Sequence, residues 1–309
     1  MGIIEHNFAE WDEYQQFNHQ SYRATLRHCG RGGVELSVRL VKPMFEPKIP
    51  GPSRDDMTEA ERQERDRLNR LRSVARARRQ LRLLVKSMGA DRLLTLTWRE
   101  NMTDIDRAQK AWQKFVRLVR VRYPDNKFLC VREYQERGAI HLHVALSGHF
   151  DVHWLRYCWY VALGHKAKFV YPNGKKTVQA FIKPEGEKVW RPAYSSEVLG
   201  SINIRGMQTR WGEGDRDYWK ADKIAFYLTK YLDKSFDEIE DGRRRYWPSQ
   251  NCEKPTIKKF WLGATNVVEA IKEAHALVSE TYGMTRSKLW LSFDNCNIWI
   301  AGVGNEPPF

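Results

Sequence analysis

The sequence predicts an α+β protein built on a central antiparallel sheet with helices packed against it. Apolar and other residues alternate over residues 139–146, which is typical of a strand. The preceding run, 128–135, also has strand character, and a tight turn at Glu136-Arg137-Gly138 lies between the two. Apolar residues recur at helical spacing over about 103–122 and 151–163. An antiparallel hairpin flanked by helices indicates this fold class.

The other elements follow in chain order. A strand-like run at 33–41 and a proline-bearing linker precede a long charged helix over 54–88, which Gly89 closes. A strand is predicted at 92–98. Beyond the central hairpin and its helix we expect a hairpin over 167–182 around Asn173-Gly174, a strand near 198–204, a helix at 222–234, a helix after 263 and a hairpin at 288–303. We therefore predict an N-terminal extension (1–88), a main domain (89–250) and a C-terminal accessory segment (251–309).

The composition favours a polynucleotide partner. The 309 residues include 52 Lys and Arg against 38 Asp and Glu, a formal net charge of +14 and a pI near 9.6, which suits phosphate binding. The five cysteines are scattered and form no CxxC pair, which indicates reduced thiols. Neither a signal peptide nor an apolar run near the roughly 20 residues of a spanning helix is present. We expect a cytoplasmic protein without a membrane partner.

The basic residues are concentrated in the predicted long helix. Between Arg67 and Lys86 eight residues are basic and none is acidic, whereas 54–66 mixes both signs. This asymmetry favours contacts with a DNA backbone by Arg76, Arg78, Arg79 and Arg82, although a solvated helix face would show the same composition.

A second basic cluster, Arg243-Arg244-Arg245, is followed by Tyr246 and Trp247. Aromatic residues interleaved with arginines suit stacking on unpaired bases. Trp247 can equally be a core residue.

Two histidines and one carboxylate share a face of the predicted hairpin. His141 and His143 point the same way because strand side chains alternate between faces, and the hairpin brings Glu133 to that face. This set is typical of a divalent-metal site with open positions. His149 and His153 are alternative ligands, but parity and spacing favour Glu133.

Two tyrosines and a lysine form a patch on the helix predicted at 222–234. Spacings of three and four place Tyr227, Lys230 and Tyr231 side by side, next to an apolar stripe. Tyrosine pairs at this spacing commonly cover a core, but two phenols with a lysine between them, in a chain with His-X-His, are hard to explain by packing alone.

Together these motifs resemble the rolling-circle replication initiators of the HUH endonuclease class, closest to the two-tyrosine bacteriophage replication proteins. The resemblance rests on the strand Leu93-Leu94-Thr95-Leu96-Thr97-Trp98, on His141-Leu142-His143 with Glu133 upstream, and on Tyr227-Leu-Thr-Lys230-Tyr231. It covers roughly residues 88–250. It implies an HUH-like sheet, Mg²⁺ or Mn²⁺ held by His141, His143 and Glu133, and site-specific nicking and joining of single-stranded or melted DNA through a 5′-phosphotyrosine. Tyr227 is the expected first nucleophile, Tyr231 serves termination and re-initiation, and Lys230 favours the phenolate.

The expected partners are a replication origin in single-stranded DNA, a host helicase and a host polymerase. The sequence contains no Gly-X4-Gly-Lys-Ser/Thr loop, so no nucleotide cofactor is expected and strand separation needs a separate helicase. Two alternatives remain: an HUH transposase or relaxase, and a non-catalytic nucleic-acid-binding protein.

Overall fold

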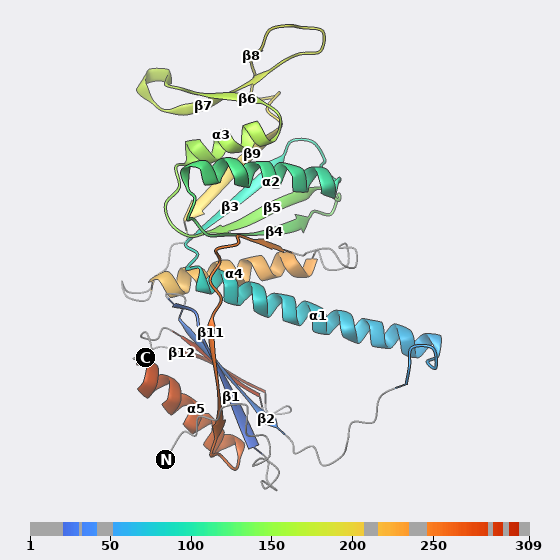
Figure 1. The fold of residues 1–309 in the computed structure, drawn as a ribbon, viewed down its shortest axis with the longest axis vertical. Coiled ribbons are helices and arrows are strands. Elements are labelled where there is room, and N and C mark those ends of the chain that lie inside the picture. The colour runs from blue at the N-terminus through green and yellow to red at the C-terminus, as the bar shows by residue number, and fades with distance from the viewer. Residues whose placement is uncertain are drawn as a thin grey trace. The chain divides into compact units, whose positions relative to one another are not determined.

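The computed structural model describes residues 21–30, 33–41, 52–206, 216–234, 246–283, 287–292 and 297–302. They divide into two compact units, and Figure 1 shows their elements. The first unit takes its described residues from 1–79, 211–219 and 253–309, and the second from 80–210 and 220–252. Helix α1 (Glu59–Ser87) begins in the first unit and ends in the second.

The first unit is an antiparallel sheet covered on one face by a helix. Its strand order is β11-β1-β2-β13-β12, and α5 (Val267–Tyr282) packs on the face that carries Leu26, Leu36 and Ile300. Segments from both ends of the chain therefore pair directly, as in β1 with β11. The strands are β1 (Ser21–His28), β2 (Val34–Val41), β11 (Thr256–Leu262), β12 (Ser287–Ser292) and β13 (Asn297–Gly302).

The second unit is built on an antiparallel sheet with the order β10-β4-β5-β3-β9. Its centre is the β4–β5 hairpin, in which Gly138 adopts φ +78° at the turn. The strands are β3 (Arg92–Trp98), β4 (Phe128–Tyr134), β5 (Ile140–Leu146), β9 (Gly200–Gly206) and β10 (Tyr246–Pro248).

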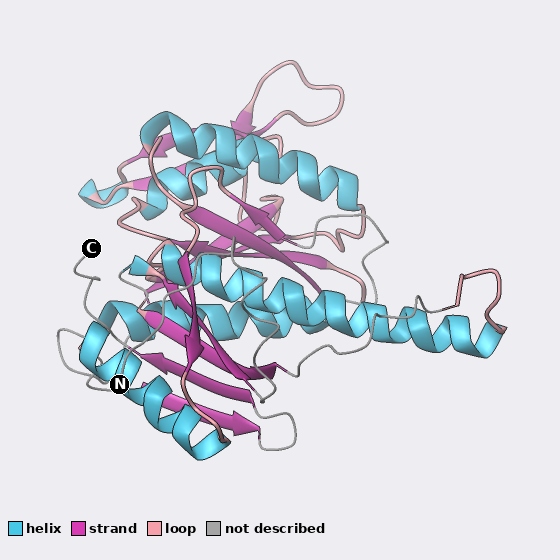
Figure 2. Ribbon diagram, turned by 60° about the horizontal axis from the view of Figure 1, so that its bottom comes forward, coloured by secondary structure: helices cyan, strands magenta, loops and turns pink. Residues whose placement is uncertain are grey.

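Helices α2 (Ile105–Arg122) and α3 (Val152–Ala162) cover one face of this sheet (Figures 1 and 2). Even-numbered strand residues such as Leu96, Leu142 and Val144 point into the core beneath them. Gly200 of β9 is closely surrounded. An added Cβ there would lie 2.2 Å from the Thr97 carbonyl oxygen of the neighbouring strand β3 and 2.7 Å from Leu163 Cδ1 at the end of α3. We call this side the core face.

Helix α4 (Arg216–Lys234) lies on the opposite side of the sheet (Figure 1), where the odd-numbered strand residues point. Ile224, Leu228 and Leu232 form its buried stripe, as the sequence predicted. We call this side of the sheet the site face.

A smaller three-stranded antiparallel sheet, β6-β7-β8, packs on α3. It comprises β6 (Lys166–Val170), β7 (Thr177–Ile182) and β8 (Arg191–Pro192), and a 3₁₀ turn, Pro172–Gly174, connects the first two. Asn173 and Gly174 there adopt φ values of 51° and 72°, which suits the predicted Asn-Gly turn.

The structure confirms an α+β protein with antiparallel sheets. The predicted hairpin at 128–146 and the predicted helices at 103–122, 151–163 and 222–234 are present. The sequence analysis missed β1, although its apolar residues alternate with polar ones, and it missed β8, β10 and β11, of which β8 and β10 are only two and three residues long. No helix among the described residues is long and apolar enough to cross a membrane.

Candidate active site

The predicted metal ligands lie on the site face. Glu133 pairs directly with His141 in the β4–β5 register. His143 pairs with Thr95 on β3. Since directly opposed residues of an antiparallel pair share a face, all four side chains lie on one side of the sheet.

His143 is held by contacts at both ring nitrogens. Its Nε2 lies 2.7 Å from Glu133 Oε2, and its Nδ1 lies 3.2 Å from the Thr95 hydroxyl. Because an ionised carboxylate only accepts hydrogen bonds, the N–H at Nε2 donates in this contact. The two side chains are 5% and 14% exposed, so water screens this pair little.

His141 has a different environment. Its Nδ1 lies 3.2 Å from Gln135 Nε2, which orients the ring. Burial lowers the pKa of His141, and it outweighs the opposing effect of the Glu133 carboxylate; the neighbouring His143 and Arg137 lower the pKa further. The ring is therefore neutral near pH 7 and has a nitrogen lone pair for a ligand.

The two tyrosines of α4 pack against His143. The Tyr231 ring stacks on the imidazole with centroids 4.2 Å apart and an interplanar angle of 12°. The Tyr227 ring meets it edge-on at 5.9 Å. The helix period thus brings both phenols to the same imidazole, as the spacing of four predicted.

The two phenol groups are also bonded to each other, with the Tyr231 hydroxyl donating to the Tyr227 oxygen. Burial, this hydrogen bond and the negative charge of Glu133 raise the pKa of Tyr231 well above its ordinary value. A donated hydrogen bond stabilises negative charge on the oxygen that accepts it. The pair is therefore asymmetric, with the Tyr231 hydroxyl as the donor and the Tyr227 oxygen as the acceptor.

Lys230 is the third residue of the predicted patch on α4. Its side chain is exposed on α4, and it makes no hydrogen bond or ion pair with any residue in the described ranges. A different lysine anchors the helix: Lys86 of α1 is fully buried, and its Nζ lies 3.9 Å from Asp222 Oδ1. This ion pair joins the end of α1 to the tyrosine helix.

The donor set fits a divalent metal in its chemistry. Two imidazoles and a carboxylate share the face, and Thr95 can accept from Nδ1–H of His143 when Nε2 binds a metal, as partners of metal-bound histidines do. In the placed side chains, however, no three His, Cys, Asp or Glu residues of the described chain converge closely enough to hold an ion. His141 is near the start of β5, whereas the alternative ligands His149 and His153 come after the end of that strand.

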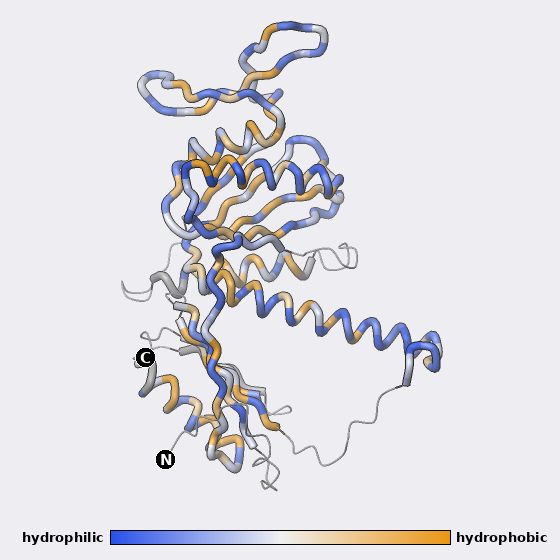
Figure 3. The backbone as a smooth tube through the Cα atoms, viewed as in Figure 1, coloured by the Kyte–Doolittle hydropathy of each residue, from blue (hydrophilic) through white to orange (hydrophobic). Residues whose placement is uncertain are grey.

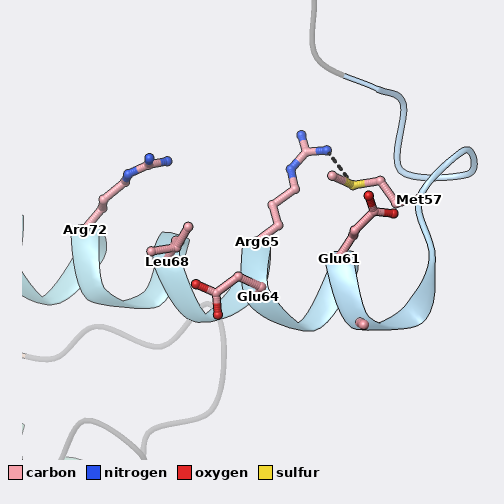
Figure 4. Close-up of a pocket in the computed structure, with 7 residues that line it drawn as sticks. Met57, Glu61, Glu64, Arg65, Leu68 and Arg72 are labelled. Carbon is pink, nitrogen blue, oxygen red and sulfur yellow. Dashed lines mark hydrogen bonds between the residues drawn. The ribbon is translucent and has the colours of Figure 1, made fainter.

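Helix α1 carries the predicted basic residues on a surface that is hydrophilic over most of its length (Figure 3). Arg76, Arg78 and Arg79 are exposed and Arg82 is half-buried. Nearer the start of α1, acidic and basic side chains pair, as in Arg67 with Glu64 at 2.7 Å. A shallow hollow there, lined by Met57, Glu61 and Arg65 among others (Figure 4), brings together no catalytic set.

The second predicted basic cluster, Arg243, Arg244 and Arg245, lies outside the described residues. Trp247, which could have been a base-stacking or a core residue, packs within the protein. Its ring stacks on Trp112 with centroids 6.3 Å apart, and Arg132 lies 4.9 Å from its centroid on the core face.

Residues 91–236 match the protein family described as replication-associated protein ORF2/G2P. This part of the chain belongs to that family. It contains β3, the β4–β5 hairpin and α4, the elements that carry the site. No curated protein and no solved structure matches the chain.

Sequence reasoning missed three residues that contact the candidate site or its helix. The sequence analysis included Thr95 only as part of a motif. The pairing of β3 with β5 places Thr95 directly opposite His143 and so on the same face. Gln135 lies in the turn of the hairpin, and Lys86 was counted as one of the basic residues. For Lys86 no sequence signal distinguished the buried cation from its exposed neighbours.

Proposed function

We propose that this protein nicks and rejoins single-stranded or locally melted DNA at a specific site, through a covalent 5′-phosphotyrosine, and so initiates and terminates rolling-circle replication. The observation that carries the proposal is the packing of Tyr227 and Tyr231 against His143, with Glu133 bonded to the same imidazole. The replication-associated family of residues 91–236 supports it. The arrangement of strands and helices also suits an HUH-like sheet.

The reaction is a transesterification. The Tyr227 hydroxyl gives up its proton as its oxygen attacks the phosphorus atom, the bond between phosphorus and the 3′-oxygen breaks, and the 3′-oxygen takes up a proton to leave a free hydroxyl. The bond energy is kept in the tyrosyl phosphoester, so that a 3′-hydroxyl can later reverse the step. Tyr231 offers a second phenol one helical turn away, which can make a second cut while the first adduct persists.

A divalent metal, Mg²⁺ or Mn²⁺, is the proposed cofactor, and Glu133, His141 and His143 would hold it. When bound, it supplies positive charge near a non-bridging phosphate oxygen. The residues themselves position the phenols, and burial of His141 and His143 keeps bulk water from screening the site.

The exposed arginines of α1 are proposed to bind the DNA backbone. Arg76, Arg78 and Arg79 supply charge without a shaped pocket, which suits sequence-independent phosphate contacts. The origin sequence is then recognised by other residues. A host helicase and polymerase remain the expected partners in the cell.

Mass spectrometry of protein–DNA adducts tests the proposal. The wild-type protein, with Mg²⁺ or Mn²⁺ and a library of single-stranded DNA, should yield a DNA-linked peptide that contains Tyr227 or Tyr231. The double variant Tyr227→Phe/Tyr231→Phe should form no adduct but bind DNA normally, since only two hydroxyls are removed. An adduct elsewhere in the chain would refute the assignment of the nucleophiles, and normal binding without any adduct would indicate a non-catalytic DNA-binding protein.

A further inference from the structure

The β6-β7-β8 sheet has two different faces. On the inner face, Phe169 stacks on Trp154 and Tyr157 of α3 with centroid distances of 6.2 and 5.4 Å. Val178 and Ala180 of β7 are buried. The inner face therefore packs against α3, and the Lys176 ammonium also lies 4.8 Å from the Phe169 centroid.

The outer face carries the alternate residues of the same strands. Lys166 pairs with Phe181 in the β6–β7 register, and Lys168 pairs with Gln179. Residues that oppose each other share a face. With Trp190, which precedes β8, these residues define what we call the outer face: Lys166, Lys168, Gln179, Phe181 and Trp190.

Each lysine of the outer face lies over an aromatic ring. Lys166 Nζ is 4.6 Å from the Trp190 centroid, and Lys168 Nζ is 4.8 Å from that of Phe181. Both lysines are exposed, and neither forms an ion pair with any described residue. A cation–π contact at an exposed site is weak, about 0.5–1 kcal/mol, so a ligand can readily displace the lysine from the ring.

The surroundings of the outer face are basic. Between Lys166 and Arg191 seven residues are basic and only Glu185 and Glu187 are acidic. Arg191 is already paired with Glu197. A strongly basic surface with rings beneath its cations suits a ligand that combines phosphates with flat apolar groups.

We propose that the outer face binds unpaired nucleotides of single-stranded DNA, with bases on Trp190 and Phe181 and phosphates on Lys166 and Lys168. The inference rests on the proposed function for the identity of the nucleic acid. Unpaired strands fit better than duplex because only their base faces are accessible for stacking. An acidic protein would satisfy the lysines but gives the rings no comparable partner.

This surface is a second DNA contact, separate from the tyrosines. Helix α3 and the five-stranded sheet lie between the outer face and α4 (Figure 1). A short strand at the site face therefore does not reach the outer face, whereas a longer strand can contact both. The outer face extends the bound length of DNA and leaves the chemistry unchanged.

The test compares two double variants with the same charge change. Lys166→Gln/Lys168→Gln alters the outer face, and Lys110→Gln/Lys114→Gln removes two lysines of α2, outside the β6-β7-β8 sheet. Fluorescence anisotropy with labelled oligo(dT) is measured for one oligonucleotide of about 8 nucleotides and one several times longer, since single-strand sites commonly span about 4–16 nucleotides. Adduct formation is measured in parallel on the short oligonucleotide.

The outer-face variant should bind the long oligonucleotide at least about tenfold more weakly, and its log–log salt slope should fall by about 1.4, or roughly 0.7 for each lost phosphate contact on a single strand. Trp190→Leu should weaken long-strand binding by about fivefold or more without changing the slope, because stacking carries no charge. The control variant, and adduct formation on the short strand, should be unaffected.

Equal affinities of the outer-face and control variants for the long strand would overturn the proposal and leave the surface to a protein partner. Equal weakening for duplex would overturn the stacking role. These results are distinct from failure of the proposed nicking function, which appears as absence of an adduct in the wild-type protein.

Discussion

The two faces of the β10-β4-β5-β3-β9 sheet have opposite characters, although the same strands supply both. Leu96, Leu142 and Val144 on the core face are fully buried in one apolar cluster with α2 and α3. The residues next to them in sequence, Thr95 and His143, lie on the site face against the tyrosine helix. Because successive side chains of a strand point to opposite faces, neighbouring residues of one strand can serve the apolar core and the candidate site.

The faces also differ in how polar groups are satisfied. On the site face, imidazole, carboxylate and hydroxyl groups bond to one another within a half-buried cluster. On the core-face side, the buried guanidinium of Arg132 lies over the Trp247 ring, and Asp151 caps the start of α3. Substitutions on the two sides should therefore change different measurements.

The largest expected effect comes from the phenols. Tyr227→Phe should abolish the first cut, because it removes the attacking oxygen. Tyr231→Phe should slow that cut by about tenfold or more, since it removes a hydrogen bond to the developing phenolate, a contact worth about 1.5–3 kcal/mol to a charged group. Single-turnover adduct formation on an oligonucleotide measures both.

Urea unfolding is the control for the tyrosines. Each Phe variant should lose no more than about 1.5 kcal/mol, because the rings still pack on His143. Faster adduct formation by Tyr227→Phe than by Tyr231→Phe would reverse the proposed order of the nucleophiles.

Adjacent residues on opposite faces give the sharpest form of the comparison. His143→Gln should reduce nicking by about 100-fold or more, the scale of removing a positioned acid–base or charge-stabilising group. Leu142→Ala should destabilise the fold by about 2–5 kcal/mol, because it opens a cavity at a fully buried position. Unfolding free energies and cleavage rates are measured for both variants.

The comparison fails if the two variants show the same changes in unfolding free energy and cleavage rate. A His143→Gln protein that unfolds as readily as Leu142→Ala would show that the imidazole is mainly a packing residue. Leu142→Ala protein, assayed below its unfolding temperature, should retain most of its adduct formation.

The sequence predicted the site face better than the connections around it. Parity alone placed Glu133, His141 and His143 on one side, and helical spacing placed Tyr227 with Tyr231, because both are local geometric rules. The docking of α4 against His143 is a tertiary contact, which the spacing of the motifs in the chain does not encode.

The pairing of the chain's two ends was not predictable by the same reasoning. Strand β1 alternates Tyr22, Ala24 and Leu26 with polar residues, but its partner β11 lies more than two hundred residues away. Lys86 was not predictable either: the sequence analysis counted it among the basic residues of α1, and the structure buries it beside Asp222 of the tyrosine helix. Burial, unlike spacing, depends on the whole fold.

The ion pair between Lys86 and Asp222 should contribute to the stability of the fold, and removing either partner should have a different cost. Asp222→Asn should cost about 2–4 kcal/mol, because it leaves the buried Lys86 cation beside a neutral amide. Lys86→Met should cost less than Asp222→Asn, since it removes the fully buried partner and leaves Asp222, which is 18% exposed, with partial access to water.

Urea denaturation of the two variants measures this asymmetry. Equal costs would mean that Lys86 keeps its charge by other contacts. Asp222→Gln serves as the matched control for the loss of charge with a longer side chain, and it should resemble Asp222→Asn.

The smallest expected effect lies on the core-face side, at Asp151. Burial opposes ionisation of this carboxyl, but the hydrogen bond from Lys176 at 2.6 Å, backbone N–H groups at the start of α3 and the Lys176 charge together lower its pKa to about 2. A lowered folded pKa means that the carboxylate's contribution is complete above the unfolded pKa of about 3.9 and is lost as the pH falls through the folded value near 2. Asp151→Asn should therefore destabilise the protein by about 1–2 kcal/mol at pH 7, after allowance for partial exposure.

The difference between Asp151→Asn and wild type should shrink as the pH falls from about 4 toward 2, and urea unfolding across that range measures it. Nicking at pH 7 should be unchanged, because Asp151 lies at the N-terminus of α3, away from the tyrosine helix. A loss of nicking without a loss of stability would contradict the proposed difference between the two faces, because it would place a charge needed for nicking on the core-face side.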